Sequence, residues 1–341
     1  MQIGYIDHLV CPQTKTKLSL IQQECHENGT IHRGALSTIS GITYPIENSI
    51  PNFISPDDSL ESAYAINLFR NKASIYDKFQ HLSFELFGCN EADVRESLIK
   101  KLNLNENYQI LEASAGTGRD SVLIKKHMKQ GSVLHVQDIS MDMLQELKKK
   151  FTPKDPVCIT QSNSLFLPYK DKMFDCIYSF GGIGMNTYAD NKKMFKEVVR
   201  VAKPGAKVVI GGLSLAPWLY QTEFGMILRN HNTHYENKII LEDMPIEARD
   251  VTVSWILNGA GFCLEFTIGE GEPTADFDFK IPGDRGGTLR TRYYGKLEGV
   301  SPEVKRRALK ACSKSGLSMY EFLNQAVSSA STKILGQENE K

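Results

Sequence analysis

The 341-residue sequence predicts an α/β domain whose core is a mostly parallel sheet. The first observation behind this prediction is the alternation of short apolar runs with longer helix-like segments from about residue 106 onward. Parallel strands need crossover connections of helical length, and these segments supply them. The second observation is the continuous apolar run AKVVIGGL at 206–213, which is typical of a strand that is covered on both faces.

The expected elements follow one another closely along the chain. Apolar residues have helical spacing in three segments: 119–129, the segment that follows the potential N-cap Ser140, and 194–202. Pro204–Gly205 ends the third of these helices. The expected strands are 108–114, 132–138, 156–162, 174–180 and 206–213. Right-handed crossovers would place the carboxyl ends of these strands at one edge of the sheet, where ligands bind in such folds.

The loop after the first expected strand is a candidate ligand site. It reads EASAGTGRD, in which Gly116 and Gly118 allow a tight turn and a close approach of the backbone to a ligand. The N–H groups at the start of the following helix would favour an anionic group. A dinucleotide fingerprint needs a third Gly or Ala, but Ser121 stands at that position, which disfavours a nicotinamide-dependent oxidoreductase.

An acidic residue ends the second expected strand. Asp138 lies 22 residues beyond Gly116. A carboxylate at this place can accept hydrogen bonds from both hydroxyls of a ribose, with no phosphate required. The two loops together therefore predict a ligand that contains a ribose.

The segment ILEASAGTGRDS (110–121) resembles motif I of class I S-adenosylmethionine (SAM)-dependent methyltransferases. Glu112, Gly116 and Gly118 match this motif, whereas Ser114 stands where a first glycine is usual. Three later segments are similar to further motifs of ubiquinone/menaquinone-type methyltransferases: VQDISMDML (136–144), NSLFLPYKDKMFDCIYS (163–179) and EVVRVAKPGAKVVIGG (197–212). The resemblance covers about 105–270. It implies a Rossmann-like sheet, mostly parallel with an antiparallel last strand, and SAM as the cofactor.

The resemblance also implies roles for individual residues. Asp138 would bind the ribose, Ile139 would lie against the adenine, and the amide oxygen of Asn163 would replace a usual aspartate that accepts the adenine amino group. Ser179 and Phe180 would border the methyl group. The sequences typical of amino-N and cytosine-C5 methyltransferases do not occur here, so both acceptor types are disfavoured. The expected cofactor-binding residues are Tyr76, Glu112, Ser114, Ala115, Gly116, Gly118, Asp138, Ile139, Met143, Asn163, Ser164, Ser179 and Phe180.

The segment RNHNTHYEN after the fifth strand is the expected acceptor side of the site. His231 and His234 are spaced to share one helix face, with Tyr235 beside them, and are the candidate catalytic residues. Two exposed helix histidines are the alternative interpretation. Methyl transfer is an in-line displacement, so alignment and exclusion of water can supply much of the acceleration without an obligatory catalytic side chain. The sequence offers no third ligand that would make this pair a metal site.

Residues 56–105 are expected to form a helical lid or linker before the SAM-binding domain at 106–299. Aromatic rings in this segment could face a sulfonium cation, or they could simply pack a helix onto the sheet. The aromatic residues concerned are Tyr64, Phe69, Tyr76, Phe79, Phe84 and Phe87.

Residues 1–55 resemble the small zinc-ribbon-like module that precedes some methyltransferase domains. Cys11-Pro12 and Tyr44-Pro45-Ile46 match that module, but three of its four ligand positions hold hydroxyl residues. Hydroxyls bind zinc poorly compared with thiolates, so we expect the module to fold without a metal. Substitute ligands from the nearby residues Cys25, His26 and His32 are the alternative.

Residues 300–341 are expected to form a helical appendage. RGGTLRTRYYGKLEGV (285–300) is expected to complete the sheet as the antiparallel last strand. Ser301-Pro302 would start one helix, and Ser318 with Glu321 would form the capping box of the next. This order of elements resembles ribbon-helix-helix DNA-binding proteins, but a docking role or a homodimer through these helices is favoured.

Composition narrows the functional class. Forty basic residues balance forty acidic ones, so binding of nucleic acid would need a local basic patch. The lysine-rich stretches at 148–150 and 305–310 are better explained as solvated helix faces. Seven cysteines without paired spacing indicate a reducing compartment, and no signal peptide or membrane span is evident, so we expect a cytoplasmic protein. The sequence predicts a SAM-dependent methyltransferase that acts on a small metabolite in a biosynthetic pathway. An RNA methyltransferase and a SAM-binding protein without catalysis are the alternatives.

Overall fold

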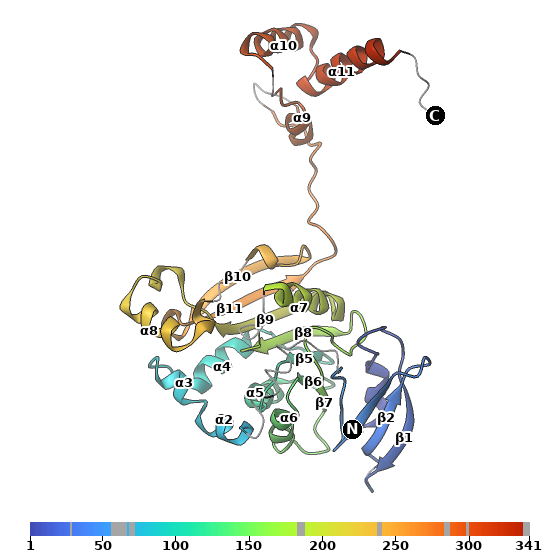
Figure 1. The fold of residues 1–341 in the computed structure, drawn as a ribbon, viewed down its shortest axis with the longest axis vertical. Helices are drawn as coiled ribbons and strands as arrows, with labels where there is room; N and C mark the ends of the chain where they lie inside the picture. Colours follow the sequence, from blue (N-terminus) through green and yellow to red (C-terminus); the bar gives the residue numbers. More distant parts are fainter. Residues whose placement is uncertain are drawn as a thin grey trace. The chain divides into compact units, whose positions relative to one another are not determined.

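The computed structural model describes residues 1–27, 29–55, 67, 72–182, 188–236, 241–282, 287–297 and 300–336. The chain divides into two compact units, Met1–Pro273 and Thr274–Lys341 (Figure 1). The first unit contains the sheet, the N-terminal module and the candidate site. The sheet domain was expected to continue to residue 299, but the compact unit that contains it ends at Pro273.

A seven-stranded sheet forms the centre of the first unit, in the order β10-β11-β9-β8-β5-β6-β7. Its strands are β5 (Gln109–Ala113), β6 (Val133–Asp138), β7 (Val157–Gln161), β8 (Phe174–Phe180), β9 (Ala202–Leu213), β10 (Ala248–Ile256) and β11 (Gly261–Ile268). The five strands from β5 to β9 are parallel, and β11 is antiparallel to both β9 and β10. The strand order changes direction between β5 and β8, and this switch point is where ligands bind in open α/β sheets. The predicted fold class is confirmed.

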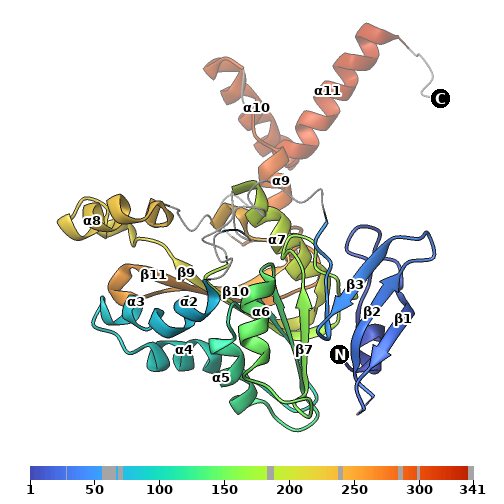
Figure 2. The same cartoon turned by 60° about the horizontal axis from the view of Figure 1, so that its bottom comes forward.

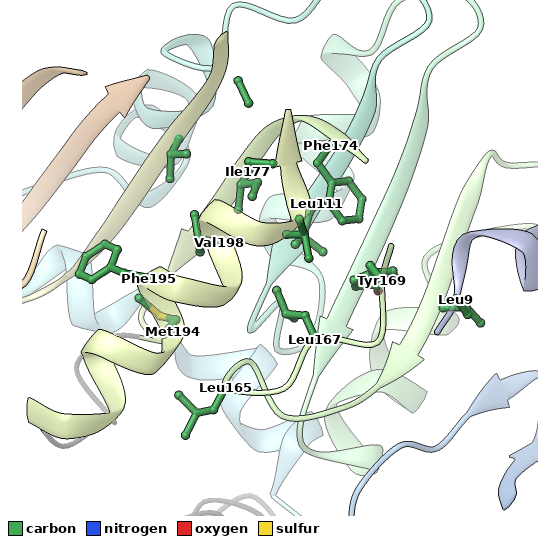
Figure 3. Packing of buried hydrophobic residues seen from close by; sticks show 14 of the residues in the cluster. Leu9, Leu111, Leu165, Leu167, Tyr169, Phe174, Ile177, Met194, Phe195 and Val198 are labelled. Carbon is green, nitrogen blue, oxygen red and sulfur yellow. The ribbon is translucent and has the colours of Figure 1, made fainter. Parts of the chain in front are cut away.

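Helices cover both faces of this sheet. Alternate residues of one strand point to opposite faces, so Ile110 packs with α4 (Glu91–Lys100), α5 (Arg119–His127) and α6 (Met141–Lys148), whereas Leu111 packs with α7 (Tyr188–Val201). Figure 3 shows the cluster that contains Leu111, in which α7 side chains lie against residues of β5 and β8. Each buried strand therefore contributes to two cores, as the continuous apolar runs predicted.

The antiparallel last strand is β11, and the expectation that 285–300 would form it is wrong. Residues Leu289–Tyr294 form the short helix α9, which Thr288 and Thr291 start with a capping box. The strand position beside β9 is filled instead by Gly261–Ile268, whose side chains are almost entirely buried. A buried apolar run competes for this place better than a segment with several charged residues.

The N-terminal module is a four-stranded antiparallel sheet beside β7 (Figure 2). Its strands are β1 (Ser19–Cys25), β2 (Ile31–Ser37), β3 (Thr43–Glu47) and β4 (Ile50–Pro51). The Phe53 N–H donates to the carbonyl oxygen of Gln161 in β7 at 2.8 Å, and the Val10 N–H donates to that of Pro168 at 2.9 Å. The module thus covers the edge strand of the large sheet, which would otherwise expose unpaired backbone groups.

The module has a core without a cluster of metal ligands. The Cys11 thiol is buried and lies 3.1 Å from the Tyr44 hydroxyl. Among the described residues no group of three or more His, Cys, Asp or Glu side chains is placed to hold a metal ion. His26 and His32 have ring centroids 4.6 Å apart, but Cys25 is exposed at the end of β1.

In the described residues of the second unit, the chain forms α9, α10 (Pro302–Ser315) and α11 (Met319–Leu335). Ser301 caps α10 and Ser318 forms a capping box with Glu321 at the start of α11, so both expected helix starts are confirmed. The helices pack on one another through the first half of α11, while its second half is exposed. No helix in the described part of either unit is long and apolar enough to cross a membrane.

The segment before β5 is helical, as expected, with α2 (Ala73–Phe79), α3 (Leu82–Glu85) and α4 in its described part. Phe84 and Phe87 are buried, whereas Phe79 is exposed. Tyr64 and Phe69 lie outside the described residues.

Candidate cofactor and acceptor site

A cavity of about 510 Å³ opens at the carboxyl ends of β5, β6, β8 and β9. This volume is in the range of small-molecule sites. Loops of the sheet form one wall, which we call the cofactor wall, and α3, α8 (Glu223–His231) and the following 3-10 helix η4 (Thr233–Glu236) form the other, which we call the acceptor wall. Expected residues on the cofactor wall are Tyr76, Ser114, Ala115, Gly116, Asp138, Ile139, Met143, Asn163, Ser164 and Phe180.

The loop after β5 reaches the cavity through a left-handed turn. Ser114, Gly116 and Gly118 have φ values of 58°, 55° and 79°. A Cβ at Gly116 would meet no atom within 4 Å, so this glycine leaves open space for a ligand, whereas a Cβ at Gly118 would lie 2.6 Å from Leu147. Gly118 therefore serves the packing of α5 and does not line the cavity.

Ser114 occupies a backbone conformation that favours glycine. This explains why a glycine is usual at the corresponding motif position. Its side chain lies beside Gly182, where a Cβ would come within 2.5 Å of the Ser114 hydroxyl. The absence of a side chain at Gly182 therefore makes room for this serine.

Asp138 is held at the end of β6 by two backbone hydrogen bonds. Its Oδ2 accepts from the Gly116 N–H and its Oδ1 accepts from the Ser140 N–H, each at 2.8 Å. The carboxyl is buried, and burial raises its pKa above the ordinary value although both backbone donors oppose the shift. Because each carboxylate oxygen can accept more than one hydrogen bond, Asp138 can still bind hydroxyl groups in the cavity.

Arg95 brings a buried positive charge to the cavity. Its Nε donates to Glu91 at 2.7 Å and its Nη1 donates to Asp120, while the guanidinium lies 5.2 Å from the Phe84 ring and 5.0 Å from the Phe180 ring. Burial alone would lower the pKa of Arg95, but the two carboxylates raise it above its ordinary value. The residue is thus a fixed cation between aromatic rings.

Asp77 links α2 to the loop after β5. It accepts hydrogen bonds from Thr117 at 2.5 Å and from Lys150 at 2.8 Å, and Arg119 donates to its backbone carbonyl at 2.6 Å. Although burial alone would raise the pKa of the carboxyl, the bonds from Lys150 and Thr117 lower it. These contacts hold the helix that carries Tyr76 against the cofactor loop.

Asn163 lies at the end of β7 as expected. It is buried, lines the cavity, and its Oδ1 accepts from the Leu165 N–H at 3.0 Å. This turn fixes the side chain beside Ser164.

The three candidate catalytic residues all line the cavity. Tyr235 is buried, His234 is half-buried and His231 is exposed. The prediction of one shared helix face is wrong, because α8 ends at His231 and Asn232 has an extended backbone. The Asn232 side chain accepts from the His234 N–H at 2.9 Å and starts the new turn η4.

Two other expected residues do not line the cavity. Glu112 is buried below the loop, where it accepts a hydrogen bond from Ser121, and Ser179 is buried at the end of β8. Burial, and then the nearby charge of Asp120, raise the pKa of Glu112 well above its ordinary value. Their positions indicate structural support for the loops.

Several cavity residues were missed from the sequence. Arg95 carried a usable signal, because it shares a helix face with the buried residues Leu98, Ile99 and Leu102 and a lone charge on such a face needs buried partners. Gln137 had no such signal; its side chain accepts from the Ser114 N–H at 3.2 Å and so shapes the loop. The remaining missed residues include Thr117, Arg119, Asp120, Asp190 and Asn232.

Residues 58–223 match the ubiE/COQ5 methyltransferase family. This match covers the loops after β5, β6 and β7, which contribute to the cofactor wall. The chain carries a class I SAM-dependent methyltransferase domain. Its cofactor is SAM, in agreement with the prediction from the motifs.

Known methyltransferases are similar to part of this chain. The demethylmenaquinone methyltransferase of Halalkalibacterium halodurans is 33% identical over 139 residues, which cover 40% of this chain and 55% of that protein. That of Lactiplantibacillus plantarum is 29% identical over 118 residues, covering 34% and 49%. The ubiquinone/menaquinone biosynthesis C-methyltransferase of Blochmanniella floridana is 27% identical over 170 residues, covering 49% and 63%. The chain thus spans about half the length of the relatives it matches.

Solved methyltransferases are also similar to the chain, at low identity. Phosphoethanolamine N-methyltransferase 2 of Haemonchus contortus, solved with SAM, has a TM-score of 0.49 at 13% identity, covering 64% of this chain and 62% of that one. Geranyl diphosphate C-methyltransferase of Streptomyces coelicolor A3(2) has a TM-score of 0.41 at 14% identity, covering 53% and 79%.

The residues of the cofactor wall fit SAM. Gly116 and Gly181 both line the cavity, and a Cβ at either position would meet no atom within 4 Å, which leaves room for a bound molecule against the backbone. Asp138 offers acceptors for hydroxyl groups, and Arg95 offers a positive charge. Donors and acceptors of the kinds that a nucleoside and an amino-acid carboxylate need are therefore present.

Proposed function

We propose that this chain transfers the methyl group of SAM to a small, largely apolar acceptor. The observation that carries the proposal is one continuous cavity that joins the cofactor loops to an apolar chamber containing two histidines. SAM would supply an electrophilic methyl group on a sulfonium. The protein has to align the acceptor with that group and keep water away.

The cofactor wall would hold SAM through three polar residues. Asp138 would accept hydrogen bonds from the ribose hydroxyls, and Asn163 would accept one from the adenine amino group. Nη2 of Arg95 makes no hydrogen bond within the described part of the chain, and we assign it to the methionine carboxylate. Tyr76, on α2, would close the site over the cofactor.

The acceptor wall favours a flat apolar molecule with a hydroxyl group. Its apolar side chains surround two histidines and a tyrosine, which can orient polar substituents. The relatives are named as methyltransferases of demethylmenaquinone and of ubiquinone/menaquinone biosynthesis, which supports a hydroxylated aromatic or quinol-like acceptor. The apolar residues that line the cavity beside these polar groups are Phe84, Phe87, Leu213, Leu228 and Leu257.

His234 is the proposed general base. It is half-buried in the cavity wall, so its imidazole can reach an acceptor while remaining partly shielded from water. The imidazole would take the proton that the acceptor loses as its new bond to the methyl carbon forms. His231, which is more exposed, would orient the acceptor.

Label transfer from methyl-tritiated SAM tests this proposal. We expect the full chain to label 1,4-dihydroxynaphthalene, and the Asp138→Ala variant to label it at a rate at least tenfold lower. Label found in tRNA and not in the naphthalenediol would show an RNA methyltransferase. Binding of S-adenosylhomocysteine without transfer to any of a panel of phenols, quinols or tRNA would show a SAM-binding protein that lacks catalysis.

A homodimer through α10 and α11 stays a prediction. The second half of α11 exposes Val327, Ile334 and Leu335, which a second copy could cover. Light scattering of the purified chain would determine its mass in solution.

A further inference from the structure

The helix α2 borders the cavity but has little apolar packing of its own. All seven of its residues are described, and Ala73 alone among them is buried, whereas Ile75 and Phe79 are exposed. Tyr76 is half-buried and lines the cavity from this helix. The next helix, α3, differs, because its Phe84 is buried within an apolar cluster. Apolar burial therefore fixes α3 much more firmly than it fixes α2.

The contacts that fix α2 are polar and meet at Asp77. Its Oδ1 accepts from the Thr117 hydroxyl at 2.5 Å and from Nζ of Lys150 at 2.8 Å, and it lies 3.5 Å from Nη1 of Arg119. The backbone carbonyl of Asp77 accepts from the same Arg119 nitrogen at 2.6 Å. Thr117 belongs to the loop after β5, and Lys150 follows α6, which lies beside α2 (Figure 1). One residue thus joins α2 to two segments of the cofactor wall.

Asp77 makes these contacts from outside the cavity. It does not line the cavity, although its neighbours Tyr76 and Gln80 do. The side chains of Asp77, Lys150 and Arg119 are 27%, 26% and 25% exposed. Ion pairs at such positions are weaker than fully buried ones, because water and salt compete for the charges. These contacts can therefore break while the rest of the domain stays folded.

We propose that α2 is a lid that opens each time SAM enters or S-adenosylhomocysteine leaves, and that the contacts of Asp77 hold this lid closed. Asp77 is a positioning residue, because it acts on the cofactor through Tyr76 and the loop after β5. The proposal rests on the assignment of SAM to the cofactor wall, and it holds for any methyl acceptor.

A lid of this kind has a kinetic signature. Opening has to precede both entry and release of the cofactor, so a less stable closed lid raises both rate constants. The contacts of Asp77 stabilise the closed lid equally in the free and the bound protein, so kon and koff rise by the same factor. Their ratio is Kd, which therefore stays nearly constant. A residue that only shaped the binding loop would change Kd instead.

Surface plasmon resonance on the tethered full chain, with S-adenosylhomocysteine as the ligand, measures both rate constants. Asp77→Asn keeps an oxygen that can accept from Thr117 but removes the charge that pairs with Lys150. We expect kon and koff each to rise by about fivefold or more, while Kd stays within about threefold of wild type. The control is Glu85→Gln, at an exposed position of α3 that does not line the cavity, which should leave both rate constants unchanged.

Lys150→Met tests the same contact from its other side. Lys150 does not line the cavity, and its removal leaves the carboxylate of Asp77 in place. Alone it should raise kon and koff by about twofold or more. Combined with Asp77→Asn it should add no further increase, because the two residues share one contact. Should Asp77→Asn fail to fold, Lys150→Met alone decides the question.

Three results would overturn the proposal, and they differ in what else they contradict. Unchanged rate constants in the folded variants would show that the contacts of Asp77 do not limit cofactor exchange. A higher koff with an unchanged or lower kon would show that Asp77 only shapes the loop after β5. Absence of binding to folded wild type would contradict the assignment of SAM to the cofactor wall and, with it, the lid.

Discussion

The two walls of the main cavity are built differently. On the cofactor wall, backbone hydrogen bonds and buried ion pairs fix each polar group: Asp138 is held by two N–H donors and Arg95 by two carboxylates. On the acceptor wall, the polar residues lie on a short helix and a single 3-10 turn, and His231 is exposed. The cofactor wall is therefore rigid, whereas the acceptor wall depends on weaker local structure.

The family match divides the cavity along nearly the same line. It ends at residue 223, where α8 begins, so the loops of the cofactor wall lie inside it and the two histidines lie outside it. The family match therefore supports the cofactor wall of this chain, whereas the acceptor has to be determined on this chain. Substitutions on the two walls should accordingly have separable effects on folding, cofactor binding and turnover.

The largest effect on folding is expected from Arg95→Met. Removing the guanidinium leaves Asp120 buried without its ion-pair partner and leaves Glu91 paired with Arg119 alone, and breaking a buried ion pair in this way costs about 3–5 kcal/mol. Urea denaturation would measure the free energy of unfolding. Arg33→Met, at an exposed position in β2, is the control and should change it by about 0.5 kcal/mol or less. A loss below about 1 kcal/mol for Arg95→Met would mean that the buried network does not stabilise the cofactor wall.

On the acceptor wall, His234→Ala should lower kcat by a factor of about 10²–10⁴, the usual contribution of a general base. The Kd for S-adenosylhomocysteine should stay within twofold, since His234 lies outside the cofactor wall. Glu236→Ala, an exposed neighbour that does not line the cavity, is the control for both measurements. If cofactor affinity falls as much as turnover does, the two walls are not separable.

A pH series on Glu112→Gln examines the support beneath the cofactor loop. The pKa of Glu112 is higher in the folded than in the unfolded chain, so its favourable contribution is complete below the ordinary pKa of 4.5 and is lost as the pH rises. Glutamine at this position has no carboxyl group to ionise, so its contribution to stability does not fall as the pH rises, and its side-chain oxygen can still accept a hydrogen bond from Ser121. The variant should therefore gain stability relative to wild type between pH 4 and pH 8 in urea unfolding. A difference that is constant across this range would show that Glu112 is not held with a raised pKa.

The smallest effect is expected from Ser114→Gly. Glycine relieves the left-handed backbone at this position, which should stabilise the fold by up to about 1 kcal/mol after the greater freedom of the unfolded chain is subtracted. Thermal unfolding and the Kd for S-adenosylhomocysteine would both be measured. Destabilisation by more than about 1 kcal/mol would show that contacts of the serine hydroxyl outweigh the backbone strain.

The sequence predicted the parts of the fold that follow from local pattern. Five parallel strands, the caps at Ser140 and Ser318, and the placing of Asp138 at a strand end all depend on short-range rules of periodicity and capping. The last strand was misplaced because its pairing with β9 joins segments that are far apart in the sequence, and no local pattern encodes that pairing. Tertiary contacts decided that choice.

The residues of the candidate site also divide into those that a local sequence pattern predicts and those that only tertiary contacts bring together. Several residues of the loop after β5 that line the cavity were found by motif, but Gln137 reaches the loop from a neighbouring strand and Asp77 reaches it from α2. Such contacts join positions 23 and 40 residues apart, and no periodic pattern encodes them. His231 and His234 were placed on one helix because their spacing fits one, whereas the side chain of Asn232 supports a break between them.

The most direct test of the account is calorimetric titration of the full chain with S-adenosylhomocysteine, on wild type and on Asp138→Ala. We expect micromolar binding to wild type. We also expect a loss of at least tenfold in the variant, because one hydrogen bond to a charged acceptor contributes about 1.5–3 kcal/mol. The absence of binding at millimolar ligand to folded wild type, or equal binding by the variant, would contradict the assignment of this cavity to SAM.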